Sequence, residues 1–200
     1  MSTTSLEFTE PEFTFPPEEG ELVARQYANA SEILEYGSGG STVLAARSTN
    51  ARVLSIESDK KWAQNLTGFF DHLGIEKDRA TVHWSNIGPT GKWGYPIDQS
   101  HWRKYPAYAL SPWEKYDISP DVVLIDGRFR LACLAATMAF ATKPTTVLFD
   151  DYTIRKVYHA AEKFIQPVQV AGRMAKFEIE PMGRDAAEFA TMIRWFFLMK

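Results

Sequence analysis

The sequence predicts an α/β fold: a doubly wound, mostly parallel seven-stranded sheet that ends in a C-terminal antiparallel β-hairpin. Three observations support this fold class. From residue 32 onward, short apolar runs alternate with segments whose apolar residues have helical spacing. Two of the runs, 122–125 and 145–149, are apolar almost throughout, which is typical of strands covered on both faces. Near the C-terminus, two apolar segments follow each other with no helix between them, which favours antiparallel pairing.

The N-terminal half opens with an acidic, proline-containing stretch. Residues 1–15 are expected to form an extended arm, and Pro16 and Pro17 followed by glutamates suit the first turn of a helix over 17–29. The expected elements that follow are a strand around 33–34, a glycine turn, a helix over 41–48, a strand over 52–57, a helix capped by Asp59 and ended by Gly74, and a strand over 81–84.

In the C-terminal half, an irregular stretch after residue 87 leads to the strand over 122–125. A helix over 131–138, the strand over 145–149 and a helix over 154–164 follow. The predicted hairpin joins 176–180 to 189–198 around a turn at 181–185. We expect residues 1–31 to form an arm and a helix, and residues 32–200 to form a single domain with an aromatic-rich insertion at 87–118.

The composition is that of a globular chain and excludes several classes of protein. Of the 200 residues, 45% are hydrophobic and 24% are charged, and the net charge is −3. The single cysteine, Cys133, excludes an internal disulfide scaffold. There is no basic run to suggest nucleic acid and no apolar segment long enough for a membrane span or leader. We therefore expect a cytoplasmic protein whose partner is a small molecule, with neither nucleic acid nor a membrane as partner.

A glycine-rich turn, Glu35-Tyr-Gly-Ser-Gly-Gly-Ser-Thr42, joins the first predicted strand to its helix. Glycines permit a tight turn and let a ligand approach the backbone, and the helix N-terminus offers unpaired N–H donors. Thr42 stands where a dinucleotide fingerprint needs its third glycine, and neither a P-loop nor a nucleophile elbow is present. A carboxylate, Glu57, ends the second strand 22 residues after Glu35.

The acidic residue, the glycine turn and the carboxylate of the next strand together resemble the class I S-adenosylmethionine-dependent methyltransferases. The resemblance implies a Rossmann-like fold over 32–198 with S-adenosylmethionine as cofactor. Gly37 and Gly39 would approach its methionine part, Glu57 would accept hydrogen bonds from the ribose, and Ser85, Asn86 and Ile87 would flank the adenine. The implied cofactor-binding set also contains Glu35, Ser38, Ser58 and Asp126. Ser41 and Asn86 depart from the family pattern, and a glycine turn that binds nothing is the alternative.

Three aspartates, Asp126, Asp150 and Asp151, follow the two apolar strands and form the predicted catalytic set. Carboxylates held close together repel each other unless a cation or a proton intervenes, and oxygen ligands suit Mg²⁺ or another divalent cation. Their positions are similar to those of the metal ligands in catechol and caffeoyl-coenzyme A O-methyltransferases, which implies a metal that binds a substrate hydroxyl. The alternatives are helix capping and a general base.

Two further features suggest substrate contacts. Arg128 and Arg130 could clamp a carboxylate or phosphate, or pair with the nearby aspartates. The insertion at 87–118 is rich in Trp and Tyr, among them Trp93 and Tyr95, and suits either a substrate lid or a homodimer surface.

These features favour an O-methyltransferase that acts on a small acceptor with a hydroxyl group. The segments around Asp126 and Asp150 also look like those of an uncharacterised bacterial methyltransferase-like group and, more distantly, of plant glucuronoxylan methyltransferases. One alternative is a non-catalytic cofactor-binding or protein-interaction module on the same fold. A nicotinamide-dependent oxidoreductase is another, which Thr42 weakens.

Overall fold

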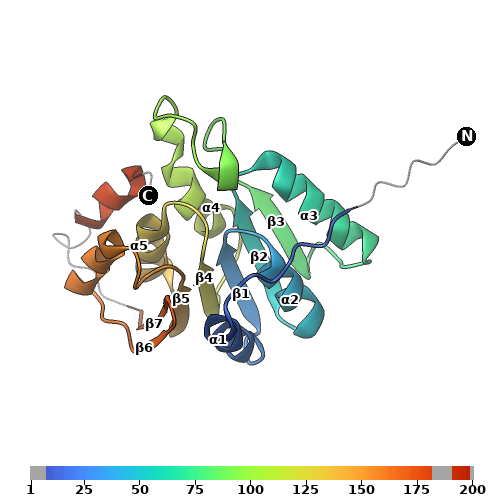
Figure 1. Ribbon diagram of the computed structural model, residues 1–200, viewed down its shortest axis with the longest axis horizontal. Helices are drawn as coiled ribbons and strands as arrows, with labels where there is room; N and C mark the ends of the chain where they lie inside the picture. The colour runs from blue at the N-terminus through green and yellow to red at the C-terminus, as the bar shows by residue number, and fades with distance from the viewer. Residues whose placement is uncertain (1–7, 182–190, 199–200) are drawn as a thin grey trace, which may run out of the picture.

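The computed structural model describes residues 8–181 and 191–198 and contains a seven-stranded sheet of order β3-β2-β1-β4-β5-β7-β6 (Figure 1). The pairs β1·β2, β2·β3, β1·β4 and β4·β5 are parallel, whereas β7 is antiparallel to β5 and β6 is antiparallel to β7. The fold class predicted from the sequence is therefore confirmed. The strands are β1 (Glu32–Tyr36), β2 (Arg52–Glu57), β3 (Ala80–Trp84), β4 (Val122–Ile125), β5 (Thr145–Phe149), β6 (Gln169–Ala171) and β7 (Met174–Ile179).

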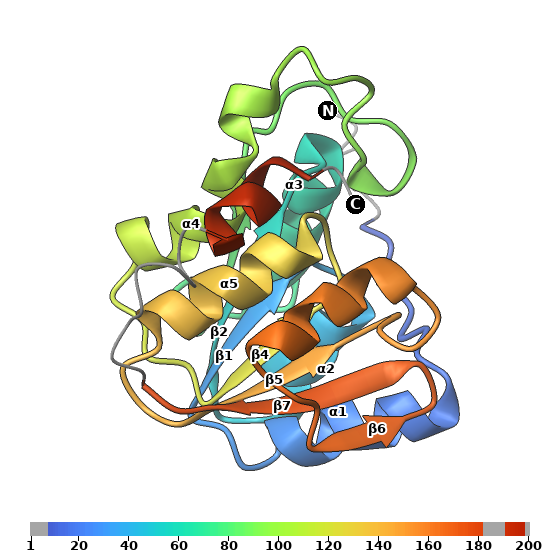
Figure 2. The same cartoon turned by 90° about the vertical axis from the view of Figure 1, so that its left-hand side faces the viewer.

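Helices cover both faces of the sheet (Figures 1 and 2). They are α1 (Pro17–Tyr27), α2 (Gly40–Ser48), α3 (Lys60–His72), α4 (Pro106–Lys115) and α5 (Arg130–Phe140), with 3-10 segments η1 (Lys92–Gly94), η2 (Trp102–Lys104), η3 (Lys156–Lys163) and η4 (Arg194–Phe197). Alternate strand residues enter two separate cores: Ile33 and Val53 pack with α1, α2 and α3, whereas Leu34 and Leu54 pack with α4 and α5. This alternation is what a parallel sheet covered on both faces requires. None of the described helices is long and apolar enough to cross a membrane.

The predicted local signals position the first half of the chain. Glu18 and Glu19 lie in the first turn of α1, directly after Pro17. Asp59 caps α3, its Oδ1 accepting hydrogen bonds from the backbone N–H groups of Lys61 at 2.8 Å and Trp62 at 3.0 Å. Gly74 ends that helix with a φ of +68°.

The C-terminal hairpin lies earlier in the chain than the sequence predicted. Strand β7 matches the predicted strand over 176–180, but its hairpin partner is β6, which precedes it. The two strands meet at a two-residue turn, Gly172-Arg173, in which Gly172 has a φ of +52° as the first position of such a turn favours. Of the predicted strand over 189–198, residues 189–190 lie outside the described part, and Arg194–Phe197 is a 3-10 helix whose Trp195 and Phe196 join the core beside α5 (Figure 2).

The stretch predicted to be irregular contains a helix that the sequence reading missed. Helix α4 is the crossover that connects the parallel strands β3 and β4, and it packs against α5 and β2. Pro106 at its start matches the rule for the first helical turn, but Pro112 inside it broke the helical pattern. The helix predicted over 154–164 is the 3-10 segment η3.

Candidate active site

The carboxylate of Glu35 lies beneath the glycine turn, fully buried at the C-terminal part of β1. Its Oε1 accepts a hydrogen bond from the Tyr27 hydroxyl at 2.6 Å, and its Oε2 accepts one from the Thr42 hydroxyl. Burial raises the pKa of Glu35 to about 7, although the hydrogen bonds from Thr42 and Tyr27 oppose the shift. These contacts link α1, β1 and α2, so Glu35 positions the turn from below.

Two glycines bring the backbones after β1 and β4 into contact. Gly37 has a φ of +102°, and a Cβ there would lie 2.8 Å from the Gly127 backbone nitrogen. Gly127 in turn donates a backbone hydrogen bond to the Tyr36 carbonyl at 2.5 Å. A Cβ at Gly39, in contrast, would meet nothing within 4 Å. The turn is therefore closed toward β4 at Gly37 and open at Gly39, beside the N-terminus of α2.

Glu57 connects the glycine turn to the end of β2. Its Oε1 accepts hydrogen bonds from the backbone N–H groups of Ser58 at 2.6 Å and Asp59 at 2.8 Å, and its Oε2 accepts one from the Ser38 N–H at 3.2 Å. Burial raises the pKa of Glu57, and these backbone donors lower it. The Ser58 hydroxyl donates to the Gly94 carbonyl at 2.9 Å, so the segment around η1 passes next to this carboxylate.

The residues after β3 lie at the same edge of the sheet. The Ser85 N–H donates to the Glu57 carbonyl at 2.7 Å, and Ile87 is fully buried. Asn86 is exposed, and its Oδ1 accepts a hydrogen bond from the Gly88 N–H at 3.0 Å. Ser85 and Ile87 thus fix the loop, whereas Asn86 is the one of the three on the surface.

Asp126 follows β4 and is the most accessible of the three predicted catalytic aspartates, with 41% of its side chain exposed. Its Oδ1 accepts a hydrogen bond from Arg130 at 2.9 Å. Desolvation raises the pKa of Asp126, the Arg130 charge opposes the shift, and the negative charges of Asp150 and Asp151 add to it. Its carboxylate is the one that a bound molecule can reach.

Asp150 and Asp151 follow β5 and are engaged by arginines. Arg173 donates to both oxygens of Asp150, at 3.0 and 3.2 Å. Arg155 lies 2.8 Å and Arg130 3.4 Å from Asp151 Oδ2. Asp151 also has a φ of +58°, unusual for a residue other than glycine. We call Asp126, Asp150, Asp151, Arg130, Arg155 and Arg173 the arginine–aspartate cluster.

Three carboxylates can lie close together here without a metal ion, because three guanidinium groups balance their negative charge. Within the described ranges, no group of three or more His, Cys, Asp or Glu residues could hold a metal ion. The prediction that Asp126, Asp150 and Asp151 bind a divalent cation is therefore not supported. The sequence did not predict Arg155 and Arg173 as site residues, since they lie 5 and 23 residues after Asp150 and no spacing rule links them to it.

The two arginines after Asp126 have different environments. Only 4% of the Arg130 side chain is exposed, and it donates to the carbonyls of Gly127, Asp126 and Asp150 as well as to the Asp126 carboxylate. These contacts agree with the alternative that Arg130 pairs with the aspartates. Arg128 instead stacks on Tyr95, with its guanidinium carbon 3.8 Å from the ring centroid.

Apart from the half-buried Tyr95, which stacks on Arg128, the Trp and Tyr residues of the 87–118 insertion divide into two groups. Those near or within α4 belong to the core: Tyr105, Tyr108, Trp113 and Tyr116. Trp93 and Trp102 are exposed, and Trp93 has a φ of +61° with 77% of the residue's surface accessible. Figure 2 shows the segment before α4 standing above the end of the sheet where the parallel strands terminate. A lid and a dimer surface both remain predictions for these two exposed residues.

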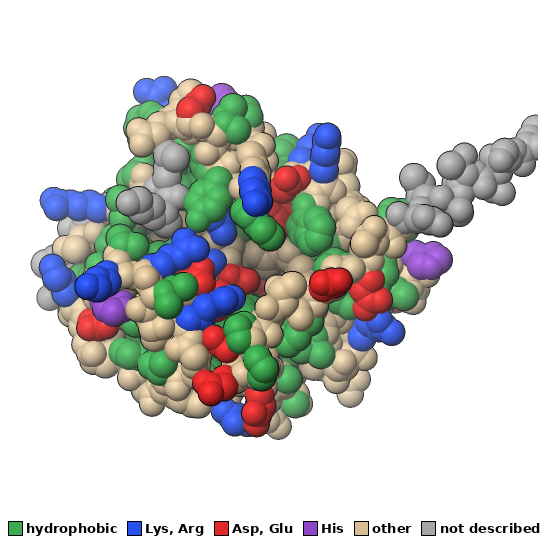
Figure 3. Space-filling view, in the orientation of Figure 1, with side chains coloured by type: hydrophobic (Ala, Val, Ile, Leu, Met, Phe, Trp, Pro, Cys, Tyr) green, Lys and Arg blue, Asp and Glu red, His purple; other side chains and the backbone are tan. Residues whose placement is uncertain are grey.

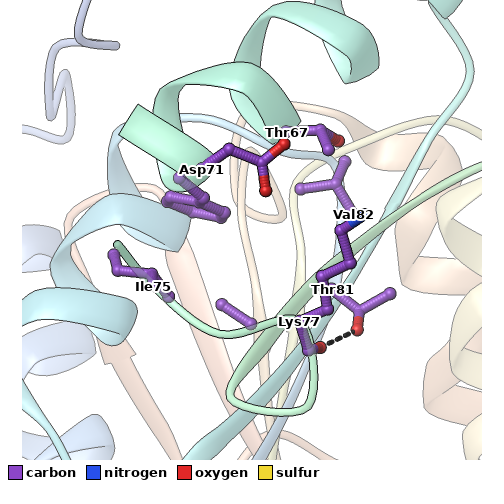
Figure 4. A pocket seen from close by; sticks show the side chains of 8 residues that line it. Thr67, Asp71, Ile75, Lys77, Thr81 and Val82 are labelled. Atoms are coloured by element: carbon purple, nitrogen blue, oxygen red, sulfur yellow. Dashed lines mark hydrogen bonds between the residues drawn. The ribbon is translucent and has the colours of Figure 1, made fainter. Parts of the chain in front are cut away.

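In the space-filling view, acidic and basic side chains gather beside a hollow near the middle of one face (Figure 3). A separate pocket between α3 and β3 is lined by Thr67, Phe70, Asp71, Ile75, Lys77, Ala80, Thr81 and Val82 (Figure 4). That pocket lies where β3 begins, at the opposite end of the sheet from Glu57 and Asp126. Ligands of parallel α/β sheets bind at the carboxyl ends of the strands, so the edge of the sheet that holds Glu57 and Asp126, and not this pocket, is the candidate active site.

Comparison with known proteins identifies the family. Neither the family models nor the curated proteins compared with the chain match it. Among solved structures, a methyltransferase-like protein, spo2022 from Silicibacter pomeroyi DSS-3, is similar with a TM-score of 0.87 and 41% identity, over 94% of this chain and 98% of that one. The chain belongs to the class I S-adenosylmethionine-dependent methyltransferase superfamily.

More distant solved structures share the fold alone. The cofactor-bound structure of Rv0187 from MTB has a TM-score of 0.58 at 17% identity, over 87% of this chain and 84% of that one. An RNA methyltransferase from Salinibacter ruber in complex with S-adenosyl-L-homocysteine has a TM-score of 0.51 at 15% identity, over 86% and 96%. The methyltransferase fold thus persists where little sequence identity remains.

Proposed function

We propose that this protein binds S-adenosylmethionine at the carboxyl ends of β1, β2 and β3 and transfers its methyl group to a hydroxyl of a small acceptor. Glu57 carries the proposal. Among the described residues, its Oε2 accepts one hydrogen bond, from the Ser38 N–H at 3.2 Å, at the point where the glycine turn meets β2. A carboxylate oxygen has two lone pairs, so Oε2 can accept a further hydrogen bond from a ribose hydroxyl.

The residues around Glu57 fit the rest of the cofactor. The space beyond Gly39 leaves room for a ligand against the backbone, next to the N–H groups that begin α2. Asn86 places an exposed amide on the adjacent strand end, where it suits the adenine. Glu35 does not reach the ligand in this arrangement, because its side chain is fully buried beneath the glycine turn and hydrogen-bonded to Tyr27 and Thr42.

When bound, S-adenosylmethionine supplies a methyl group on a positively charged sulfur. The protein must align the acceptor oxygen with that methyl group and remove the hydroxyl proton. Asp126 is the candidate base: its carboxylate would accept the hydroxyl proton of the acceptor as the methyl group passed from the sulfur to the acceptor oxygen. Its raised pKa favours this role, since a base works best when its pKa is near the operating pH.

Isothermal titration calorimetry with S-adenosylhomocysteine tests the cofactor site. The wild type should bind in the micromolar range, and Glu57→Ala should weaken binding by about tenfold to a hundredfold, because a charge-assisted hydrogen bond is lost. Asp121→Ala is the matched control: Asp121 Oδ2 also accepts two backbone hydrogen bonds, from Ser31 at 2.8 Å and Glu32 at 3.0 Å, but at the opposite end of the sheet. No binding by the wild type would contradict the proposal.

A methyl-transfer assay with Asp126→Asn tests the base. We expect a loss of about a hundredfold or more in rate, while Asn still accepts a hydrogen bond from Arg130. If S-adenosylhomocysteine affinity falls to the same extent, Asp126 acts in cofactor binding and not in proton removal. Binding of the cofactor with no transfer to any hydroxyl acceptor would favour the non-catalytic module instead.

A further inference from the structure

Among the described residues, one arginine near the candidate active site forms no ion pair with an aspartate. Arg130, Arg155 and Arg173 each lie within 3.0 Å of an aspartate oxygen. Arg128 forms no ion pair within residues 8–181 and 191–198, although it follows Asp126 by two positions. Three aspartates thus face four arginines, and the cation without an aspartate is the half-buried Arg128.

Arg128 is held in one orientation. Its guanidinium carbon lies 3.8 Å from the centroid of the Tyr95 ring, which covers one face of the planar group. Its backbone is fixed on both sides, since its N–H donates to the Tyr108 hydroxyl at 3.4 Å and its carbonyl accepts from the Cys133 thiol at 3.4 Å. The N–H groups at the edge of a stacked guanidinium remain available for a bidentate anion.

The partner ring is itself anchored. The Tyr95 hydroxyl accepts a hydrogen bond from Arg155 at 3.3 Å, and Arg155 is held by Asp151 at 2.8 Å. Two of the residues next to these groups, Phe129 and Asp151, have left-handed backbone conformations, with φ of +51° and +58°. Such strain in residues other than glycine is concentrated at functional sites.

We propose that Arg128, stacked on Tyr95, binds an anionic oxygen group, a carboxylate or a phosphate, carried by the methyl acceptor. The inference rests on the proposed function for the identity of the ligand as acceptor. The substrate class is then a hydroxyl compound with an acidic group, its hydroxyl directed to Asp126 and its anion to Arg128. Preorganisation of the guanidinium reduces the ordering cost of binding such a group.

Small probe anions test the site independently of the cofactor. Benzoate and inorganic phosphate are titrated by nuclear magnetic resonance into the protein with and without S-adenosylhomocysteine, and benzamide serves as the uncharged match for benzoate. We expect saturable binding of at least one anion in the millimolar range, and binding of benzamide at least about tenfold weaker than that of benzoate if benzoate binds. Which anion binds distinguishes a carboxylate from a phosphate.

Four variants identify the residues. Arg128→Gln should weaken anion binding by about tenfold or more and Arg128→Lys by less, since a point charge remains. Tyr95→Phe should retain most of the affinity and Tyr95→Leu should lose part of it, because only Phe preserves the stacking. Arg103→Gln is a further, matched control, since Arg103 also stacks on a ring of the same insertion, 5.2 Å from the Trp102 centroid. Its anion affinity should equal that of the wild type.

The outcomes separate this inference from the proposed function. No saturable binding of either anion, or equal affinity of Arg128→Gln and the wild type, overturns the anion site. Anion binding that depends on Arg128 in a protein that does not bind S-adenosylhomocysteine supports the anion site and overturns the methyltransferase proposal. Cofactor binding without anion binding supports the methyltransferase proposal and overturns the anion site.

Discussion

Glu35 is a fully buried carboxylate whose pKa is raised to about 7, chiefly by desolvation. Between its pKa of about 4.3 in the unfolded chain and 7, the folded state binds more protons than the unfolded state, so the free energy of unfolding falls as pH rises. Glu35→Gln cannot ionise, yet it can still accept from Tyr27. Its stability relative to the wild type should therefore improve by up to about 3 kcal/mol between pH 4.5 and 7.5.

Urea unfolding at several pH values measures this difference. Glu10→Gln is the control, because Glu10 is an exposed carboxylate paired with Arg47 at 2.8 Å. A difference between Glu35→Gln and the wild type that stays constant with pH would show that Glu35 is ionised in the fold throughout this range.

The two arginines after β4 are expected to differ in how much they contribute to stability. Removing Arg130 leaves Asp126 and the buried Asp150 and Asp151 with one counter-charge fewer, so Arg130→Met should lower the free energy of unfolding by about 3–5 kcal/mol. Arg128→Gln loses only a stacking contact and should cost about 1 kcal/mol or less. Urea denaturation at pH 7 compares them, and equal losses would contradict the division of roles between structure and ligand binding.

At the scale of elements, the sequence predicted the helices and strands whose formation depends on local patterns. The strands β1 to β5 and the helices α1, α2, α3 and α5 follow from apolar periodicity, a capping aspartate and stop signals such as Gly74. The predicted hairpin partner of β7 was wrong, because strand pairing depends on more than local sequence and the short exposed strand β6 has little apolar pattern. Helix α4 was missed because its Pro112 contradicts helical propensity locally while its buried face satisfies tertiary packing.

The candidate site was predicted only in part, for a similar reason. Residues at strand ends, such as Glu57 and Asp126, can be located from the order of elements alone. The arginines that neutralise the aspartates lie at the start of α5, immediately before η3 and in the β6–β7 turn, and only the folded chain brings them together. The sequence showed Thr42 only as a residue in the place of the third glycine of a dinucleotide fingerprint. In the fold, its buried hydroxyl donates a hydrogen bond to Glu35 and accepts one from the Gly39 N–H at 2.9 Å.

The glycine turn provides a matched pair of substitutions at this scale. Gly37→Ala places a Cβ 2.8 Å from Gly127 at a φ of +102°, so we expect a loss of about 2–4 kcal/mol of stability. Gly39→Ala meets open space and should fold with stability within about 1 kcal/mol of the wild type, yet bind S-adenosylhomocysteine at least about tenfold more weakly. Thermal melting and calorimetry measure the two effects. Unchanged affinity in Gly39→Ala would show that the cofactor does not approach this position.

At the scale of the whole molecule, the sheet order explains why distant residues meet. In the order β3-β2-β1-β4-β5, the parallel strands bring their carboxyl ends to one edge, with Glu57 on one side of β1 and the arginine–aspartate cluster on the other. The segment before α4 contacts both sides: Gly94 accepts from Ser58 after β2, and Tyr95 stacks on Arg128 after β4. The proposed cofactor and acceptor sites are thus adjacent parts of one edge, and the segment before α4 contacts both.

This arrangement predicts how the whole molecule responds to its cofactor. A ligand that binds only the folded state stabilises it by RT ln(1 + [L]/Kd), which is about 2.7 kcal/mol at a concentration of one hundred times Kd. For a domain of this size, that corresponds to a rise of roughly 5–10 °C in Tm. S-adenosylhomocysteine should produce this rise in the wild type and in Asp121→Ala. Glu57→Ala should show a much smaller rise at the same concentration, and NAD should produce none because Thr42 replaces the third glycine of its fingerprint. Differential scanning fluorimetry measures all of these, and a rise with NAD equal to that with S-adenosylhomocysteine would favour the oxidoreductase alternative.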